Sequence, residues 1–169
     1  LIQYRNGSLR FAEWNYGPML WRMHTLNALF RKNTALYDDM RITAAYQNYA
    51  ESRIDRTRNS NLRNRQAESV EALSLNIDAT RKLGGGELFY GLEIVQNNVG
   101  STGEQTDITS GETSAAVSRY PDGSTTRMLG VYTSYKKNIL SNLTILGGLR
   151  YSYNSLDAKF DTSFVKFPY

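Results

Sequence analysis

The sequence predicts an all-β protein, an antiparallel up-and-down sheet of about six strands that belongs to a larger transmembrane β-barrel. Three observations lead to this prediction. Apolar and polar residues alternate with a period of two over much of the chain. The predicted strands are longer than the roughly 5–6 residues that are usual in soluble sheets. Short and longer connections follow each other in turn, as they do in transmembrane barrels.

Residues Met128–Asn154 carry the clearest alternation. In the second half of this stretch the apolar set is Leu143, Ile145, Gly147, Leu149, Tyr151 and Tyr153. In the first half Leu129, Val131, Thr133 and Tyr135 repeat the pattern. The short polar connection Lys137–Asn142 separates the two halves, so the stretch is predicted to form an antiparallel hairpin.

Four more strands are predicted before this hairpin. They are Leu20–Phe30, Met40–Asp55, Gln66–Thr80 and Glu87–Asn98. The first residues, Leu1–Pro18, contain the turn signals Asn-Gly and Gly-Pro and an aromatic cluster, and are expected to form a loop. The tail Leu156–Tyr169 is expected to lead into another strand.

The connections between these strands predict which ends of the sheet they occupy. The first set is Arg31–Asp39, Arg81–Gly86 and Lys137–Asn142, and the second is Arg56–Arg65 and Val99–Thr126. An up-and-down sheet places alternate connections at opposite ends, so each set should lie together. Long strands with long loops at one end favour a barrel over a β-sandwich, which would show the same alternation.

One face of the predicted sheet is mostly polar. It carries Arg41, Gln47, Asn76, Asp78, Glu93, Ser134, Lys136 and Arg150. The opposite face is expected to carry Tyr46, Ile77, Leu92 and Leu149. In a large barrel the polar face lines the interior and the apolar face meets lipid.

The composition excludes several classes of protein. The 169 residues suit one domain, and 40% of them are hydrophobic. Disulfide frameworks and thiolate metal sites are excluded because the chain has no cysteine. The formal charge of +4 is modest and compatible with anionic neighbours such as lipid phosphates. The chain opens on Leu1 without a start methionine, from which we expect a piece of a larger mature protein.

Several stretches, taken in order, resemble one family. They are Arg10–Trp14, Tyr16–Pro18, Ala45–Gln47, Glu51–Ile54, Leu75–Asp78, Leu88–Glu93, Ser118–Ser124 and Gly148–Ser152. Together they resemble the barrel of TonB-dependent outer-membrane receptors of the Bacteroidetes type. The resemblance spans nearly the whole chain, so residues 1–169 are expected to be part of one barrel domain.

The resemblance implies a 22-stranded barrel, plugged by an N-terminal domain, in the outer membrane of a Gram-negative bacterium. Such receptors import scarce nutrients of the iron–siderophore, haem or cobalamin class with energy from the inner membrane, and oligosaccharide also stays open as the ligand. The implied partners are outer-membrane lipid and lipopolysaccharide, the plug and the rest of the receptor, and the TonB complex. A surface lipoprotein stays open as a further partner. Residues 1–169 are expected to depart from the complete family in having no plug, no TonB-box segment and no closing C-terminal strand.

The arginines around the second predicted connection are candidates for ligand binding. They are Arg53, Arg56, Arg58, Arg63 and Arg65, with Asp55 as the only acid among them. Guanidinium groups in a loop can capture an anionic ligand or lipopolysaccharide phosphates. The alternative is a solvated loop whose charge favours solubility. Nucleic acid is not expected, because no aromatic residues interleave with the arginines.

Aromatic and polar residues supply two further sets of candidates. Trp14 and Tyr16, with Trp21, form either an aromatic ligand platform at the outer mouth or the packing of a loop. The candidates for contact with the plug, or for pairing across strands, are Arg41, Gln47, Asn76, Asp78, Glu93 and Arg150.

No enzyme, metal site or cofactor is predicted. His24, the only histidine, is either an axial haem ligand or an ordinary strand residue near the membrane interface. No second metal-type residue stands at ligand spacing from it, and no serine–histidine–acid set can be formed. Gly84–Gly86 lacks the lysine and the helix that a phosphate-binding loop needs.

Two other functions stay open from the sequence. The first is a passive porin-type barrel without a plug or ligand specificity. The second is a soluble β-sandwich that binds a surface or a sugar, which would remain monomeric without detergent.

Overall fold

The computed structural model describes residues 4–5 and 7–160, and every regular element in them is a β-strand. The strands are β1 (Tyr4–Arg5), β2 (Ser8–Leu9), β3 (Phe11–Tyr16), β4 (Leu20–Arg31), β5 (Asp39–Thr57), β6 (Leu62–Leu83), β7 (Gly86–Asp107), β8 (Thr113–Ala115), β9 (Ser124–Leu140) and β10 (Leu143–Asp157). The prediction of an all-β fold is therefore confirmed for this part of the chain. A helix of the length and hydrophobicity needed to cross a membrane does not occur in it.

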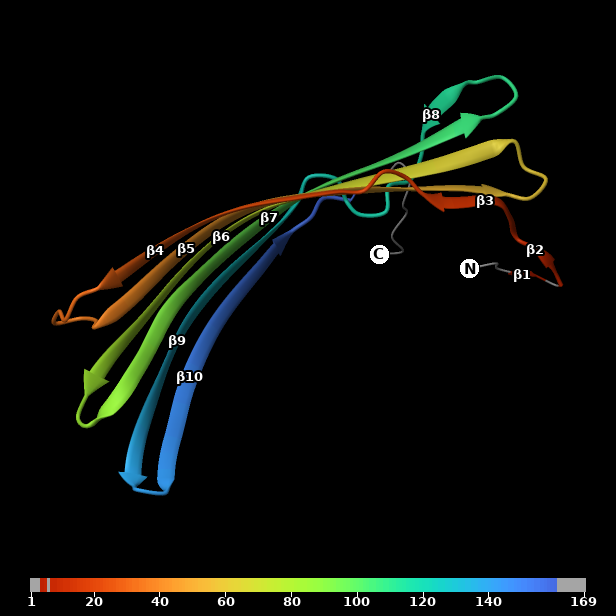
Figure 1. Cartoon of the computed structure of the whole chain (residues 1–169). Coiled ribbons are helices and arrows are strands. Elements are labelled where there is room, and N and C mark those ends of the chain that lie inside the picture. Colours follow the sequence, from red (N-terminus) through yellow and green to blue (C-terminus); the bar gives the residue numbers. More distant parts are fainter. Residues whose placement is uncertain (1–3, 6, 161–169) are drawn as a thin grey trace.

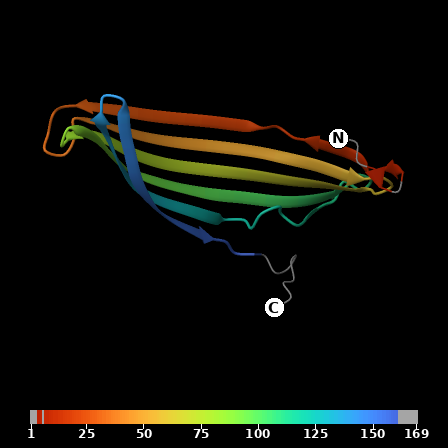
Figure 2. The same cartoon turned by 90° about the horizontal axis from the view of Figure 1, so that it is seen from below.

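The strands from β3 to β10 form one antiparallel sheet, and β1 pairs with β2 in a separate small one. The main sheet has the order β10–β9–β7–β6–β5–β3, while β4 pairs with β5 and β8 pairs with β7. The sheet is arched along its strands (Figure 1), and seen from below it curls at the β9–β10 hairpin (Figure 2). It is open in the described residues, because β10 borders it on one side and β3 and β4 on the other.

The six predicted strands correspond to β4, β5, β6, β7, β9 and β10, but several are longer than predicted. β6 and β7 have 22 residues each, and β7 ends at Asp107 rather than at Asn98. The prediction of one long polar loop at Val99–Thr126 is therefore wrong, because that stretch contains the end of β7, all of β8 and the start of β9. Both faces of these strands are polar in this region, so the sequence shows no alternation of apolar and polar residues by which the strands could be predicted.

The segment Leu1–Pro18 was expected to be a loop, but most of its second half forms β3, which pairs with the end of β5. Gly17 interrupts the edge between β3 and β4, and its N–H donates to the Ser52 carbonyl oxygen at 2.7 Å. A Cβ on Gly17 would lie 2.0 Å from Ser52 Oγ, so a larger residue would have to displace the Ser52 side chain. At the other end β10 stops at Asp157, and most of the strand expected beyond it falls on residues 161–169, outside the described residues.

The register confirms the predicted division of residues between two faces. Opposed residues on neighbouring strands share a face, and Asn76 lies directly opposite Glu93. Gln47 and Arg150 belong to the same face through the registers of the intervening strands. The other face carries Tyr46, Ile77, Leu92 and Leu149. We call these two sides the polar face and the apolar face.

The predicted ends of the sheet are also confirmed. Asp39 pairs with Thr80 and Gly86 pairs with Lys137, so the connections after β4, β6 and β9 lie together at one end. We call it the hairpin end. The connections after β5 and β7 lie at the opposite end, which we call the far end.

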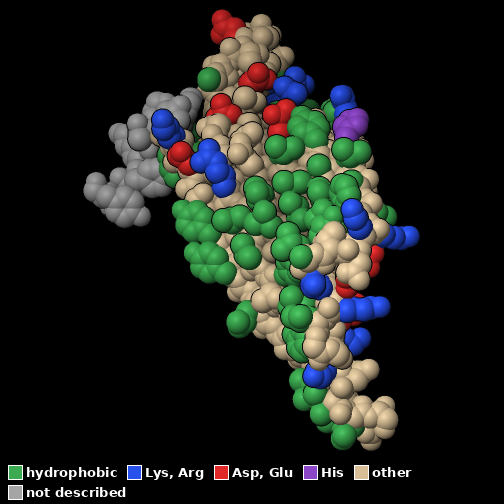
Figure 3. All heavy atoms as spheres, turned by 90° about the vertical axis from the view of Figure 1, so that its left-hand side faces the viewer, with side chains coloured by type: hydrophobic (Ala, Val, Ile, Leu, Met, Phe, Trp, Pro, Cys, Tyr) green, Lys and Arg blue, Asp and Glu red, His purple; other side chains and the backbone are tan. Residues whose placement is uncertain are grey.

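Hydrophobic side chains form a band across the apolar face, toward the hairpin end. The apolar band consists of alternate residues in Leu26–Phe30, Met40–Tyr46, Leu73–Ala79, Leu88–Ile94, Leu129–Tyr135 and Ile145–Tyr153. Its large side chains are open to the surroundings: Leu26 is 72% exposed and Leu149 is 80% exposed. Figure 3 shows hydrophobic side chains gathered across the middle of the side in view.

The described residues have no second layer that could cover this band. Their buried hydrophobic residues are Ala45 and Ala79, which are 7% and 5% exposed. A β-sandwich places the apolar face of one sheet against a second sheet. In the described residues the main sheet has no second sheet packed on either face, so they do not make the core of a sandwich.

We predict that the chain of 169 residues, expressed alone in buffer without detergent, aggregates. The exposed apolar band far exceeds the few hundred Å² that soluble monomers usually tolerate, and the two sheet edges offer unpaired backbone groups to other chains. Analytical ultracentrifugation measures the outcome as large, heterogeneous species. A monodisperse, β-rich monomer with a cooperative thermal transition would contradict the prediction.

Candidate functional site

The polar face carries a row of side chains that reach across neighbouring strands. Arg150 of β10 extends over β9 to form an ion pair with Glu93 of β7. It passes over Gly130, where a Cβ would lie 2.4 Å from Arg150 Nη2. Arg150 Nε also donates to Ser152 Oγ at 2.9 Å. Glycine at position 130 therefore leaves room above β9 for the Arg150 side chain, which reaches from β10 to β7.

A second side chain follows a parallel path. Tyr132 of β9 lies across β7 and donates its hydroxyl to a carboxylate oxygen of Asp78 on β6. It passes over Gly91, where a Cβ would lie 2.2 Å from the Tyr132 hydroxyl oxygen. The Arg150 guanidinium carbon lies 5.6 Å from the Tyr132 ring centre, within range of a cation–π contact. Residues from β6, β7, β9 and β10 are thereby linked on one face.

The sequence left two roles open for the polar residues, contact with a plug and pairing across strands. The contacts in the structure bear on the second role. Glu93, Arg150 and Asp78 make pairs across strands, as one of the two interpretations expected. Asp78 also lies opposite Arg41 in the register. Gln47 accepts a hydrogen bond from Trp21 Nε1 at 3.3 Å. All six candidates, Arg41, Gln47, Asn76, Asp78, Glu93 and Arg150, lie on the polar face, and contact with a plug stays a prediction.

The predicted arginine-rich loop is wrong as a single loop. Arg53 and Arg56 lie in β5, and Arg63 and Arg65 lie in β6, so only Arg58 lies in the connection between these strands. These two strands continue further than expected, because β5 and β6 pair without interruption up to Arg56 and Arg63.

The arginines also do not converge. Arg53 is on the polar face, where its Nη2 donates to Gln66 Oε1 at 2.7 Å. Arg56 and Arg65 lie on the apolar side of the sheet and are already paired with carboxylates. Arg56 Nε lies 2.7 Å from Glu13 Oε1, and Arg65 Nη1 lies 3.4 Å from Glu104 Oε2. One pocket of about 260 Å³ is lined by both Arg53 and Arg65, but Asp55 and Glu104 line it as well, so its charges are mixed.

The aromatic candidates share the polar face at one edge of the sheet. Trp14 and Tyr16 of β3 lie opposite Asp55 and Arg53 of β5, and their rings meet edge to face with centres 5.3 Å apart. Trp21 follows on β4, opposite Tyr49. The three side chains line the same edge of one face, an arrangement compatible with a platform and with mutual packing.

His24 lies on the apolar face at the border of the apolar band. It stacks on Tyr46 with ring centres 6.5 Å apart and planes at 23°. The position opposite Tyr46 matches the interpretation of an ordinary strand residue near the interface. Among the described residues, no group of three or more histidine, aspartate or glutamate side chains is arranged to hold a metal ion.

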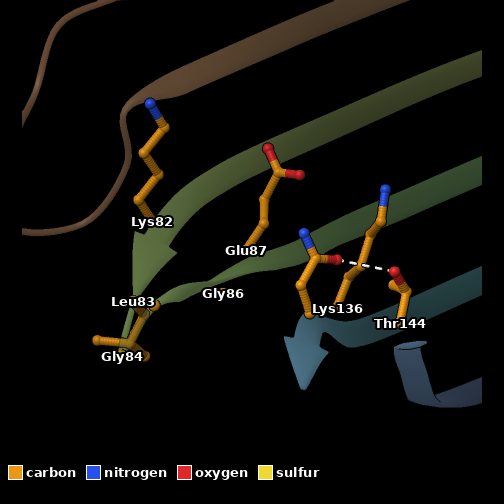
Figure 4. Close-up of a pocket in the computed structure, with 9 residues that line it drawn as sticks. Lys82, Leu83, Gly84, Gly86, Glu87, Lys136 and Thr144 are labelled. Atoms are coloured by element: carbon orange, nitrogen blue, oxygen red, sulfur yellow. Dashed lines mark hydrogen bonds between the residues drawn. The ribbon is translucent and has the colours of Figure 1, made fainter. Parts of the chain in front are cut away.

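An open depression lies on the hairpin end, where β6, β7 and β9 meet. It has a volume of about 630 Å³ and is lined by Lys82, Leu83, Gly84, Gly85, Gly86, Glu87, Lys136, Asn138 and Thr144. Lys82, Glu87 and Lys136 point the same way from three strands (Figure 4). The tight turn needs glycine, because Gly84 and Gly85 have φ values of 57° and 77°. The charges lie on an open surface, and the turn joins two strands, β6 and β7.

The far end of the polar face holds a feature that the sequence did not reveal. Residues 116–123, which we call the strap, leave β8 and cross the polar side of β7 toward β5. Gln66 Nε2 donates to the Val117 carbonyl oxygen at 3.3 Å, and the Tyr120 N–H donates to Ser101 Oγ at 3.2 Å. A Cβ on Gly103 would lie 2.4 Å from the Val117 carbonyl oxygen, so glycine is needed beneath the strap.

Glu68 lies in the region that the strap covers. It is 6% exposed, and neither carboxylate oxygen has a hydrogen-bond partner. The pKa of its carboxyl is raised above the ordinary value, mainly by burial. The negative charge of Glu51 also raises this pKa, and the positive charges of Arg119 and Arg53 partly offset the rise. Arg119 of the strap forms an ion pair with Glu51 at 3.4 Å. Sequence inspection missed this site because its residues lie far apart in the chain.

No protein-family model matches the chain, and no curated protein matches it in sequence.

We predict that Gly91→Ala lowers the free energy of unfolding of the folded protein in lipid by about 1–3 kcal/mol. The added Cβ would displace the Tyr132 ring and break its hydrogen bond to Asp78. Denaturant titration in lipid vesicles measures the change.

Gly147→Ala is the matched control, because no atom lies within 4 Å of the Cβ position there. Its effect should stay within about 0.5 kcal/mol. Equal losses in the two variants would show that the space over Gly91 is not what matters.

Proposed function

We propose that this chain forms part of the wall of an outer-membrane β-barrel, with the apolar band against lipid and the polar face toward the interior. The observation that carries the proposal is the division of one sheet into an exposed apolar face and a cross-linked polar face. Lipid-facing and interior-facing residues alternate along each strand of such barrels. With lipid on the apolar face and the barrel interior on the polar face, the receptor and the porin stay as candidate functions, and the soluble β-sandwich does not.

The dimensions of the apolar band support the proposal. It covers five residues on β4, seven on β5, β6, β7 and β9, and nine on β10. The value on β10 reaches the roughly 9–11 residues of a tilted membrane strand, and the four central strands approach it. Aromatic residues stand at both borders, with Phe30 and Tyr135 toward the hairpin end and Tyr46 and Tyr153 on the other side. Aromatic girdles mark both water interfaces in transmembrane barrels.

The slant of the band gives independent support. On β6 it ends at Ala79, and the next residue on that face is Arg81. On β7 it extends to Leu88, which lies directly opposite Arg81. On β10 it reaches Ile145, two residues past Gly147, which shares the row of Leu88. The border thus moves in one direction across the sheet, as a membrane plane does when it cuts tilted barrel strands.

The two open edges of the sheet favour the presence of further strands beside them. Strands β10 and β4 each pair on one side only in the described residues. In lipid an unpaired backbone group costs several kcal/mol, so a sheet that spans a membrane must close. We therefore propose that further strands of one barrel flank this sheet.

The proposal also limits where lipopolysaccharide makes contact. Arg56 lies ten residues beyond Tyr46 on β5, about 33 Å along a strand at roughly 3.3 Å per residue. Even with a strand tilt of about 45°, this leaves Arg56 more than about 20 Å above the apolar band. Contact with lipid and lipopolysaccharide is thus proposed at the border of the band, and the strand extensions are proposed to project outside the membrane.

We further propose that the barrel is a TonB-dependent receptor of a Gram-negative outer membrane that imports a scarce nutrient of the iron–siderophore, haem or cobalamin class. The support is the ordered sequence resemblance together with long strand extensions and a strap at the far end. In this proposal the polar face contacts a plug, and the TonB complex acts through a part of the receptor outside this sheet.

The orientation of the wall is tested by nitroxide labels at neighbouring positions. We expect a label at Leu92→Cys, on the apolar face, to be more accessible to oxygen than to a water-soluble nickel chelate. A label at Glu93→Cys, on the polar face, should show the reverse order. Residues 1–169 contain no native cysteine, so each label is unique within them. Electron paramagnetic resonance on the protein in vesicles measures both, and equal accessibilities would overturn the proposed wall.

The receptor class is tested by uptake in cells that carry the whole gene. Disrupting the gene should abolish uptake of one ligand among a ferric siderophore, haem and cobalamin, and a protonophore should abolish the same uptake. The control is diffusion of a small sugar, which should not change in either condition. Uptake that persists with the protonophore would support a passive porin and contradict the receptor.

A further inference from the structure

The strap is held to the polar face mainly by hydrogen bonds that do not involve its one arginine. Its backbone joins the edge of β7 at both ends, through Ala116 N–H to the Gly103 carbonyl and Gly123 N–H to the Val99 carbonyl at 2.9 and 3.0 Å. In the middle, Ser101 takes part twice: its N–H donates to Asp122 Oδ1 at 2.8 Å, and its Oγ accepts from Tyr120. The strap is thus anchored at its ends, and its centre covers Ser101 and the strands beside it.

Glu68 is the central residue beneath this cover. It lies in the register between Glu51 of β5 and Ser101 of β7, so the three side chains share one row of the polar face. Ser101 is 2% exposed and Glu68 is 6% exposed. A buried charge without a hydrogen bond is costly, and removing the charge by protonation relieves that cost. The row therefore contains one carboxylate whose charge state affects the stability of the closed strap.

The surrounding charges do not compensate Glu68 directly. On β5, Glu51 is engaged by Arg119 and by the Tyr49 hydroxyl, at 3.4 and 2.5 Å. Arg53, also on β5, directs its Nη2 to Gln66, while its buried Nε has no partner. From the strap, Arg119 reaches Glu51 and Asp122 accepts from Ser101. The two arginines attract the Glu68 charge from a distance, but neither forms a hydrogen bond with it.

We propose that Glu68 is a proton-binding site coupled to the strap: the closed strap holds Glu68 protonated, and loss of that proton favours release of residues 116–123 from the polar face. The proposal concerns the far end of the sheet and holds whether or not the apolar band meets lipid. A strap that opens with rising pH would uncover the row of Glu51, Glu68 and Ser101.

The direction of the pH dependence follows from the environment. Closing the strap buries the carboxyl and raises the pKa of Glu68, so the closed form binds the proton more tightly than the open form. Closure is therefore fully favoured below the pKa of the open form. It weakens as the pH rises through the higher pKa of the closed form.

The test uses a nitroxide at Val117→Cys in the protein kept dispersed in detergent micelles, with residues 1–169 otherwise free of cysteine. Val117 is 46% exposed, and its side chain makes none of the strap's hydrogen bonds. The mobile fraction of the spectrum should rise as the pH is raised from 4 to 9. With Glu68→Gln, which imitates the protonated form, the strap should stay immobile across the range. Glu71→Gln, an exposed position on the opposite face of β6, should keep the wild-type response.

A second measurement avoids the label. Trypsin cleaves after Arg119, and at pH 7.5 the wild type should be cut there several-fold faster than Glu68→Gln, with Glu71→Gln equal to the wild type. Equal cleavage rates in all three would overturn the proposal. A spectrum independent of pH would do so as well, as would a wild-type response in Glu68→Gln or closure that follows added sodium or calcium rather than pH.

Discussion

Backbone hydrogen bonding between neighbouring antiparallel strands is the interaction on which the rest of this structure depends. No second layer covers the sheet in the described residues, so the register alone assigns each side chain to a face. A slip of one residue in any strand would carry its apolar residues to the polar side. The uninterrupted pairing of β6 with β7 from Leu62 to Leu83 fixes the two central strands, and the others align on them. The two faces therefore differ in chemistry.

Within that frame, glycine positions determine how the polar face is held together. Gly91 and Gly130 leave room for Tyr132 and Arg150 to lie flat across the next strand. Hydrogen bonds and an ion pair then join residues two strands apart, which pairing between adjacent strands cannot do. In a single-layer sheet these links take the place of a hydrophobic core in keeping the strands together. The apolar face, which is proposed to meet lipid, has few such contacts.

The strands are divided along their length into two regions of different composition. Near the hairpin end the apolar band matches the proposed membrane zone, and the polar network lies behind it. Beyond Tyr46 the strands continue with polar residues on both faces of the sheet, and the strap folds over the polar face. The proposed proton site at Glu68 lies in this second region, where water reaches the sheet and pH can act on it. Transport and pH response are thus proposed for different parts of the same strands.

The sequence by itself determined the all-β class, the six main strands, their two faces and the ends at which the connections lie. Each follows from the period-two alternation, which is strong wherever one face is apolar, as in Leu73–Ala79. Only the tertiary structure decided the true ends of β6 and β7, the pairing of β3 and the separation of Arg53 from Arg56, because strands that are polar on both faces show no alternation. The paths over Gly91 and Gly130 and the pairing of Arg119 with Glu51 also needed the structure. These contacts join residues far apart in the chain, and local pattern carries no information about which distant strand a side chain will cross.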